Sequence, residues 1–268
     1  MAPRFPNPTS TAWLYMMDGT SWDNIPDDWN NINFGEIDVL ILAPLGLQDP
    51  QTGAFGVLPA LEKRFHWAIA QAKAAPRLIP GTTIKILVSQ FWGKPHEGWG
   101  YTLTALPSSE VDAYAQSVRK FLVQYDLDGY DIDYEQHNIE PTIPAILATI
   151  RAQLDALSQA TGGRPYYTTV SPAYTNYLAQ AAGSLSGLNM QSYSGGSGIT
   201  VEQLLRMGFE ADQLLYGVNA ESPDQGPTVE EALAAYRDNK LVGIHVWRVG
   251  NAQENAWQDQ IYRGLHGV

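Results

Sequence analysis

The chain of 268 residues contains no cysteine, which excludes disulfide bonds, thiolate nucleophiles and cysteine-based zinc sites. Basic residues are scarce as well: 16 Lys and Arg stand against 28 Asp and Glu, for a formal net charge of -12 at pH 7. Because nucleic acids and anionic membranes attract clusters of Lys and Arg, we expect neither as a partner. A neutral ligand fits this charge better.

Long apolar segments are also absent. No stretch reaches the roughly 18 consecutive apolar residues that would cross a membrane, and residues 1–8 lack the apolar core of a signal peptide. Two locations therefore stay open: the cytoplasm, or the cell exterior after removal of a leader. With 44% hydrophobic and 16% charged residues, the chain has enough apolar material for a folded core, and we expect a globular monomer.

Short apolar runs rich in β-branched and aromatic residues alternate with amphipathic stretches, which is typical of parallel βα units. Eight such runs occur, at residues 12–17, 37–43, 84–89, 129–135, 166–171, 188–193, 213–218 and 242–247. An open doubly wound sheet is the alternative, but no Gly-x-Gly-x-x-Gly follows the first run. Eight repeats in about 250 residues favour an α/β fold of the (β/α)8 type, a TIM barrel. We predict one barrel domain over residues 1–268.

Helices are expected between the runs, where apolar residues recur on one face. The clearest faces are Leu61, Phe65, Ile69 and Ala72; Val111, Ala115, Val118 and Leu122; and Ile143, Leu147, Ile150, Leu154 and Leu157. Thr200 with Gln203 and Thr228 with Glu231 have the spacing of capping boxes at helix starts. The helical spacing is poorer after the first, fifth and sixth runs.

Three acidic residues share one face of the fourth predicted strand. Because side chains alternate along a strand, Asp131, Asp133 and Glu135 should all point into the barrel. Burial and like-charge repulsion raise carboxyl pKa values, so at least one of the three should hold a proton near neutral pH. Glu135 falls at the end of the strand, on the side of the barrel that carries active sites.

Two other interpretations of these acids were weighed. The first is an ordinary solvated strand, which the apolar outward neighbours and the position fourth of eight disfavour. The second is a magnesium or calcium site. Because a metal site would not account for the aromatic residues at other strand ends, we expect neither a metal nor another cofactor.

The segment Asp128-Gly129-Tyr130-Asp131-Ile132-Asp133-Tyr134-Glu135 resembles the signature of glycoside hydrolase family 18, with all five fixed positions present. The resemblance extends along the chain at lower specificity. Met190-Gln191-Ser192-Tyr193 is similar to the Met-x-Tyr and Gln-x-Tyr variants of the family, and Trp247 ends the eighth strand where the family places a tryptophan under the reactive sugar. By this resemblance, the partner is a glycan that contains N-acetylglucosamine.

The resemblance also implies roles. This family uses substrate assistance, in which the acetamido oxygen of the sugar is the nucleophile. Glu135 would donate the proton, Asp133 would orient the acetamido group, and Asp131 would share a proton with Asp133. Tyr193 would donate a hydrogen bond to the acetamido oxygen, and Trp247 would pack against the sugar. Gln191 and Met190 are expected to contact the substrate.

The chain departs from the family pattern at three places: Ser194 replaces an aspartate, Ser89-Gln90-Phe91-Trp92-Gly93 replaces Ser-x-Gly-Gly, and the seventh strand ends Val218-Asn219-Ala220-Glu221. We expect Trp92 to stack on sugar, as Trp22 and Trp99 could. Asn219, with Glu221 close by, could reach a sugar from the seventh strand, although solvation of these loop residues explains them equally well.

Only about nine residues separate the seventh strand from its helix, so an α+β insertion domain is not expected and the groove should be open. An open groove suits an endo-acting chitinase. It also suits an endo-β-N-acetylglucosaminidase that cuts the chitobiose core of N-glycans. A sugar-binding lectin of the same fold is the alternative from another class, and the presence of Glu135 argues against it.

Overall fold

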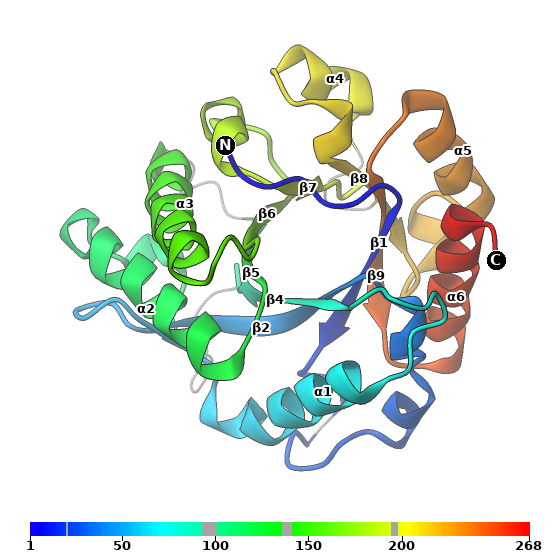
Figure 1. Ribbon diagram of the computed structural model, residues 1–268, viewed down its shortest axis with the longest axis horizontal. Helices are drawn as coiled ribbons and strands as arrows, with labels where there is room; N and C mark the ends of the chain where they lie inside the picture. The colour runs from blue at the N-terminus through cyan, green and yellow to red at the C-terminus, as the bar shows by residue number, and fades with distance from the viewer. Residues whose placement is uncertain (20, 93–100, 136–140, 194–197) are drawn as a thin grey trace.

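The structure is a computed structural model that describes residues 1–19, 21–92, 101–135, 141–193 and 198–268. Within these residues, eight parallel strands pair in the order β1-β9-β8-β7-β6-β5-β4-β2, and β1 also pairs with β2, so the sheet closes (Figure 1). The strands are β1 (Thr9–Tyr15), β2 (Val39–Asp49), β4 (Lys85–Gln90), β5 (Gly129–Tyr134), β6 (Tyr167–Pro172), β7 (Gly187–Asn189), β8 (Leu214–Asn219) and β9 (Gly243–Val249). The predicted TIM barrel is confirmed, and each predicted strand overlaps an observed one.

Helices surround the barrel in Figure 1. They are α1 (Glu62–Ala74), α2 (Val111–Tyr125), α3 (Ile143–Ala160), α4 (Val201–Arg206), α5 (Val229–Asn239) and α6 (Ala252–His266). After β1 and β6, where the helical spacing is poor, the described chain forms short 3-10 segments instead (Asp27–Asn31, Phe34–Glu36 and Leu178–Ser184). After β7, the third place where the helical spacing is poor, the short helix α4 forms, so the poor apolar pattern coincides with irregular connections at two of these three places.

Two helix starts had predicted capping boxes. At α5 both halves are present, because Thr228 Oγ1 accepts from the Glu231 amide and Glu231 accepts from the Thr228 amide. At α4 the Thr200 hydroxyl accepts from the Gln203 amide, but the Gln203 side chain donates to Thr175. A contact with the neighbouring loop thus replaces half of the second box.

One strand, β3 (Ala54–Gly56), was not expected. It pairs antiparallel with the end of β2, which continues to Asp49. The Asp49 carboxylate stabilises the turn by accepting from the Gln51 amide and the Thr52 hydroxyl. Three residues carry too little alternation to identify a strand from the sequence.

The hydrophobic core has two main parts, and a third small cluster lies where β8 and β9 pack against α5 and α6. The larger lies between the sheet and the helices and contains the outward side chains of the strands. The smaller fills the barrel and includes Trp13, Ile41 and Leu87. Phe5, from the N-terminal segment, joins this inner cluster and stacks on Tyr167 with ring centroids 4.4 Å apart. The segment before β1 therefore closes one end of the barrel.

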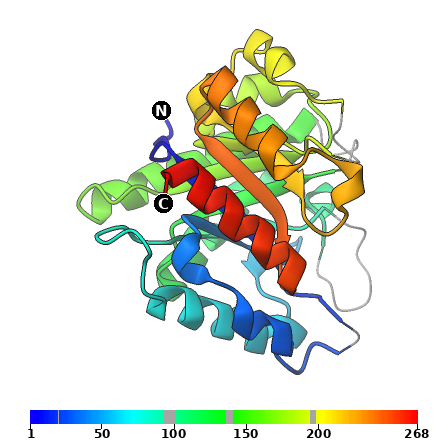
Figure 2. The ribbon, with the colours of Figure 1, turned by 90° about the vertical axis from the view of Figure 1, so that its right-hand side faces the viewer.

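Both termini lie on the same side of the barrel, on the left in Figure 2. Residues 220–228 connect β8 to α5 and contain only one short 3-10 turn, Pro223–Gln225, so no insertion domain occurs at this connection. Among the described residues, no helix is long and apolar enough to span a membrane.

Candidate active site

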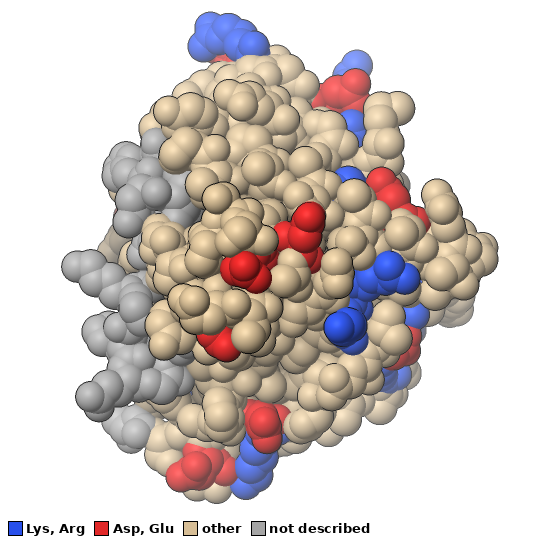
Figure 3. Space-filling model, turned by 90° about the vertical axis from the view of Figure 1, so that its left-hand side faces the viewer, with Lys and Arg blue, Asp and Glu red and all other residues tan. Residues whose placement is uncertain are grey.

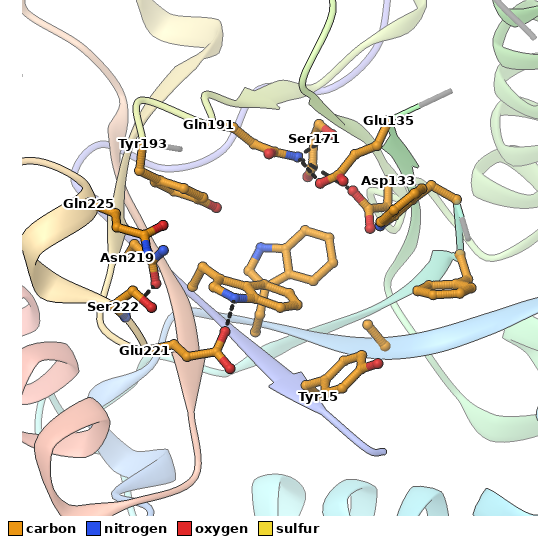
Figure 4. A pocket seen from close by; sticks show the side chains of 15 residues that line it. Tyr15, Asp133, Glu135, Ser171, Gln191, Tyr193, Asn219, Glu221, Ser222 and Gln225 are labelled. Atoms are coloured by element: carbon orange, nitrogen blue, oxygen red, sulfur yellow. Dashed lines mark hydrogen bonds between the residues drawn. The ribbon is translucent and has the colours of Figure 1, made fainter. Parts of the chain in front are cut away.

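A cavity of about 360 Å³ lies at the carboxyl ends of the barrel strands (Figure 4). This volume is in the usual range for small-molecule sites. Aromatic and polar side chains line it together: Trp13, Tyr15, Ala43, Phe91, Trp92, Asp133, Glu135, Ser171, Gln191, Tyr193, Asn219, Glu221, Ser222, Gln225 and Trp247. In a TIM barrel this end carries the active site. The described residues contain no group of three or more His, Cys, Asp or Glu side chains placed to hold a metal ion.

The acidic residues of β5 lie on the face of the strand that the alternation of its side chains predicts. Ile132 and Tyr134 are buried in the outer hydrophobic cluster. Asp131 and Asp133 are buried on the opposite face, inside the barrel. Glu135 follows the last residue of the strand and lies partly exposed at the cavity. The three carboxyls therefore run from the barrel interior to the opening.

Asp131 is fully buried among donors from three neighbouring strands. Its carboxylate accepts hydrogen bonds from Ser89 Oγ at 2.7 Å, Thr169 Oγ1 at 2.6 Å, Ser171 Oγ at 3.1 Å and Asn189 Nδ2 at 3.3 Å. Burial raises the pKa of Asp131 to about 6, although these four hydrogen bonds lower it. The donors thus stabilise an ionised aspartate in the barrel interior.

Asp133 and Glu135 form a coupled pair near the opening. Burial, followed by repulsion from Glu135 and Asp131, raises the pKa of Asp133 well above its usual value. Burial also raises the pKa of Glu135, while hydrogen bonds to Gln191 and Asp133 lower it. Gln191 Nε2 donates to Glu135 Oε1 at 2.8 Å and to the Ser171 carbonyl at 3.1 Å, and lies 3.5 Å from Asp133 Oδ1.

This geometry differs from the expected proton sharing between Asp131 and Asp133. Asp133 is hydrogen-bonded to Glu135 and Gln191, whereas the Asp131 carboxylate is surrounded by hydroxyl and amide donors. Asp131 therefore acts on Asp133 through its charge. The physical reason is the set of donors from other strands, which the sequence of β5 alone does not contain.

Tyr193 and Trp247 lie far apart in the sequence, but both line the cavity that Asp133 lines. In Figure 4 the Tyr193 hydroxyl points into the cavity, and no hydrogen bond joins it to a described residue. The Trp247 ring packs edge-on against Trp13 with centroids 5.5 Å apart and tilted against Tyr15 at 5.7 Å. Trp247 Nε1 donates to Glu221 Oε2 at 2.9 Å. Aromatic rings thus form an apolar surface facing the acids.

Comparisons with known proteins identify the fold that carries this cavity. Neither a protein-family model nor a curated protein sequence matches the chain. The multi-modular chitinase ChiW of Paenibacillus matches with a TM-score of 0.73 at 15% identity over 98% of this chain, which spans 33% of ChiW. A fungal endo-β-N-acetylglucosaminidase from glycosyl hydrolase family 18 matches with a TM-score of 0.65 at 17% identity over 97% of this chain and 99% of its own. The chain shares the fold of glycoside hydrolase family 18.

A third structure with this fold is human YKL-39, described as a pseudo-chitinase with retained chitooligosaccharide binding. It matches with a TM-score of 0.74 at 10% identity over 97% of this chain and 100% of its own. The sequence of β5 resembles the family 18 signature, and the family 18 fold extends over nearly the whole chain. The same fold serves both hydrolases and a binding protein, so the side chains of the cavity must carry the functional argument.

Most of the predicted site residues meet at the cavity of this family 18 fold. Asp133, Glu135, Gln191, Tyr193, Asn219, Trp92 and Trp247 line it, and Asp131 lies beneath Asp133. Asn219 Oδ1 accepts from the Ser222 amide at 3.0 Å, which leaves the amide nitrogen of Asn219 to the cavity. Trp99 and Ser194 lie outside the described residues.

Met190 and Trp22 do not line the cavity. Met190 is fully buried in the outer hydrophobic cluster because it alternates with Asn189 and Gln191, which point inward. We therefore withdraw Met190 as a substrate-binding residue. Trp22 packs against the same outer cluster and donates from Nε1 to the Met17 carbonyl. A tryptophan in a loop after a strand has no fixed direction, which explains the second error.

Several cavity residues were missed from the sequence. Trp13 and Tyr15 alternate on β1, and the inward alternation used for β5 would have identified them. Ser171 could have been found in the same way on β6. Ser222 and Gln225 lie in the loop after β8, where no periodic pattern indicates direction.

Proposed function

We propose that this chain is a retaining, endo-acting glycoside hydrolase that cleaves β-1,4 bonds at N-acetylglucosamine in chitin or chitooligosaccharides. The observation that carries the proposal is the position of Glu135. It faces the cavity with a raised pKa and is hydrogen-bonded to Asp133 below it. A carboxyl that keeps its proton to a higher pH than an ordinary glutamate is suited to be the general acid.

The first step breaks the glycosidic bond. Glu135 donates its proton to the leaving oxygen while the acetamido carbonyl oxygen of the same sugar attacks C1, and the bond electrons pass to the leaving oxygen. Asp133 accepts a hydrogen bond from the acetamido N–H and stabilises the oxazolinium ion that forms. Tyr193 donates to the acetamido oxygen, and Trp247 supports the apolar face of the sugar.

In the second step water attacks C1 and opens the oxazolinium ring, while Glu135 accepts the proton of the water. The acetamido oxygen and the water attack C1 from opposite faces of the sugar. Each attack inverts the configuration at C1, so the two steps together retain it. Asp131 keeps negative charge below Asp133 and thereby favours a proton on the Asp133–Glu135 pair. Gln191 holds the Glu135 carboxyl through its amide.

Two other functions deserve a direct test. An endo-β-N-acetylglucosaminidase would use the same side chains, and the short connection between β8 and α5 leaves room for a branched N-glycan as well as for chitin. The fungal relative in fold carries that activity in its name. A binding protein without hydrolase activity is supported by the fold of YKL-39, and opposed by Glu135 at the cavity.

The test compares products. The protein is incubated with chitopentaose and, separately, with a glycoprotein that carries high-mannose N-glycans, and the products are identified by mass spectrometry. We expect cleavage of chitopentaose into shorter N-acetylated oligomers. Glucosamine pentamer lacks the acetamido oxygen and should stay intact, because the internal nucleophile is missing.

The matched control is Glu135→Gln, whose amide oxygen can still accept from Gln191. General acid catalysis contributes about 10²- to 10⁴-fold, so the variant should lose turnover by that factor. Release of N-glycan with intact chitopentaose would favour the endo-β-N-acetylglucosaminidase function. Binding of chitopentaose without any cleavage would identify a lectin, and unchanged turnover in Glu135→Gln would refute the role of Glu135.

A further inference from the structure

Glu221 is an acidic residue of the cavity that the proposed reaction does not use. It follows β8, two residues after Asn219, and Figure 4 shows it across the cavity from Glu135. Its side chain is 44% exposed. A carboxylate that stays accessible inside a cavity can contact a ligand directly, unlike the buried carboxylates of β5.

The two oxygens of Glu221 are held in place but not saturated. Oε2 accepts a hydrogen bond from Trp247 Nε1 at 2.9 Å, and Oε1 lies 3.4 Å from the Arg248 guanidinium. An ionised carboxylate has about four acceptor positions. The contacts with Trp247 and Arg248 use two of them, and the exposed side of the group leaves the others to the cavity.

Arg248 orients Glu221 without neutralising it. The guanidinium is 13% exposed and lies over the Tyr15 ring, 5.7 Å from its centroid. It is shared among three carboxylates: Asp18 at 2.7 Å, Glu254 at 3.3 Å and Glu221 at 3.4 Å. One cation faces three anions, and Glu221 is the most distant of them. The Glu221 carboxylate therefore keeps acceptor strength for a ligand.

We propose that Glu221 is a specificity-determining residue that accepts a hydrogen bond from a free hydroxyl group, O3 or O6, of the β-1,4-linked N-acetylglucosamine that packs on Trp247. This assignment rests on the proposed function, which brings a sugar to that ring. Hydrogen bonds to a charged acceptor are stronger than neutral ones. The Asn219 amide nitrogen, on the same wall, supplies a donor for a sugar oxygen.

The ligand class follows from this chemistry. Glu221 favours an uncharged pyranose with a free hydroxyl at this position, and it excludes a sugar whose hydroxyl there is acylated or whose substituent is anionic. Removal of a hydroxyl-binding group leaves partner hydroxyls unpaired, which costs affinity strongly. Glu221 thus sets which sugars reach the Trp247 surface, while Glu135 cleaves the bond.

The experiment measures binding apart from catalysis. Chitotetraose affinity is determined by calorimetry in the Glu135→Gln protein and in the same protein with Glu221→Gln. The glutamine oxygen can still accept from Trp247 Nε1, but the amide NH2 that replaces the second oxygen cannot accept from a hydroxyl. We expect affinity to fall about 10- to 100-fold. Asp224→Asn makes the same charge change three residues away on an exposed side chain that does not line the cavity, and should leave affinity unchanged.

The outcomes are distinct. If Glu221→Gln melts at the same temperature as its parent and binds chitotetraose equally well, Glu221 does not bind the sugar and the assignment fails while the proposed function stands. If affinity falls equally in Asp224→Asn, a general charge effect replaces the assignment. If the Glu135→Gln protein binds neither chitotetraose nor a high-mannose N-glycan, the proposed function is wrong, and the assignment of Glu221, which depends on it, is wrong as well.

Discussion

At the scale of single residues, the three carboxyls of β5 differ in what surrounds them. Asp131 has four side-chain donors, Asp133 faces two like charges, and Glu135 lies half-open to the cavity. Burial raises the pKa of each. The surroundings therefore change along β5, from a hydrogen-bonded interior aspartate to a partly exposed glutamate. The different roles that we propose for these carboxyls depend on this change.

The negative charge of Asp131 should lower the stability of the folded protein and raise the pKa of Asp133. The Asp131→Asn variant tests both effects. Because burial raises the Asp131 pKa to about 6 from an ordinary value of 3.8, the folded protein binds this proton more tightly than the unfolded chain. Stability contributed by the group is therefore full below pH 3.8 and falls as pH rises toward 6. We compare the free energy of unfolding of Asp131→Asn with that of the parent protein. The difference in favour of the variant should be roughly 1–3 kcal/mol larger at pH 7.5 than at pH 4.5.

Urea unfolding of both proteins at the two pH values provides the measurement. An equal difference at pH 4.5 and pH 7.5 would contradict the buried ionisation of Asp131. In the same variant, loss of repulsion lowers the pKa of Asp133, so the acidic limb of the rate against pH should move to lower pH. Ser89→Ala, which removes one donor and leaves the carboxyl, serves as the control for disturbed packing.

At the scale of elements, one side chain of α1 fixes the connection after β1. Arg64 is buried and donates to four backbone carbonyls, those of Met16, Asp18, Ser21 and Asn24. Its guanidinium also lies 5.1 Å from the Trp29 ring centroid. Since Asp18 in turn binds Arg248 beside the cavity, α1 supports one edge of the site through this loop.

Arg64→Met should therefore destabilise the protein by roughly 2–4 kcal/mol, because four carbonyls lose a charged donor. Thermal unfolding measures the loss, and limited proteolysis should show faster cleavage within residues 16–26. Lys63→Ala removes a neighbouring exposed amine that donates to the backbone carbonyl oxygen of Asp23, and should change stability by less than about 0.5 kcal/mol. Equal melting temperatures for Arg64→Met and the parent protein would show that the loop does not depend on Arg64.

At the scale of the whole molecule, the two ends of the barrel have different tasks. The cavity opens at the carboxyl ends of the strands, and the inner cluster around Phe5 and Tyr167 closes the other end. On the face shown in Figure 3, basic and acidic residues are scattered, and several of them lie next to one another. The net charge of -12 makes the electrostatic potential around the molecule negative overall. The inner cluster contributes to stability.

Phe5→Ala should separate stability from catalysis. The ring is 5% exposed, and truncation of a buried phenylalanine costs roughly 3–5 kcal/mol. We expect a lower melting temperature with kcat for chitopentaose unchanged at 25 °C, because the affected residues lie at the far end of the barrel. Leu78→Ala, on a side chain that is 46% exposed, is the control and should leave the melting temperature unchanged. A fall in kcat without a loss of stability would contradict this division.

The amino-acid sequence by itself determined the alternation of strands and helices, and with it the barrel. It also determined that Asp131, Asp133 and Glu135 share a face, because both inferences depend on local periodicity. Tyr193, Gln191 and Trp247 could be placed at strand ends for the same reason. The irregular connections after β1 and β6 and the short β3 were not predictable in detail, since they lack a period.

Tertiary structure alone decided what surrounds each of these groups. The donors to Asp131 come from three other strands, and Trp13 contacts Trp247 because β1 and β9 are neighbouring, paired strands. Met190 faces away from the cavity although its neighbour Gln191 reaches Glu135. Register between strands and the direction of loops depend on contacts distant in sequence, so a local pattern fixes which face a residue occupies but not which partner it meets there.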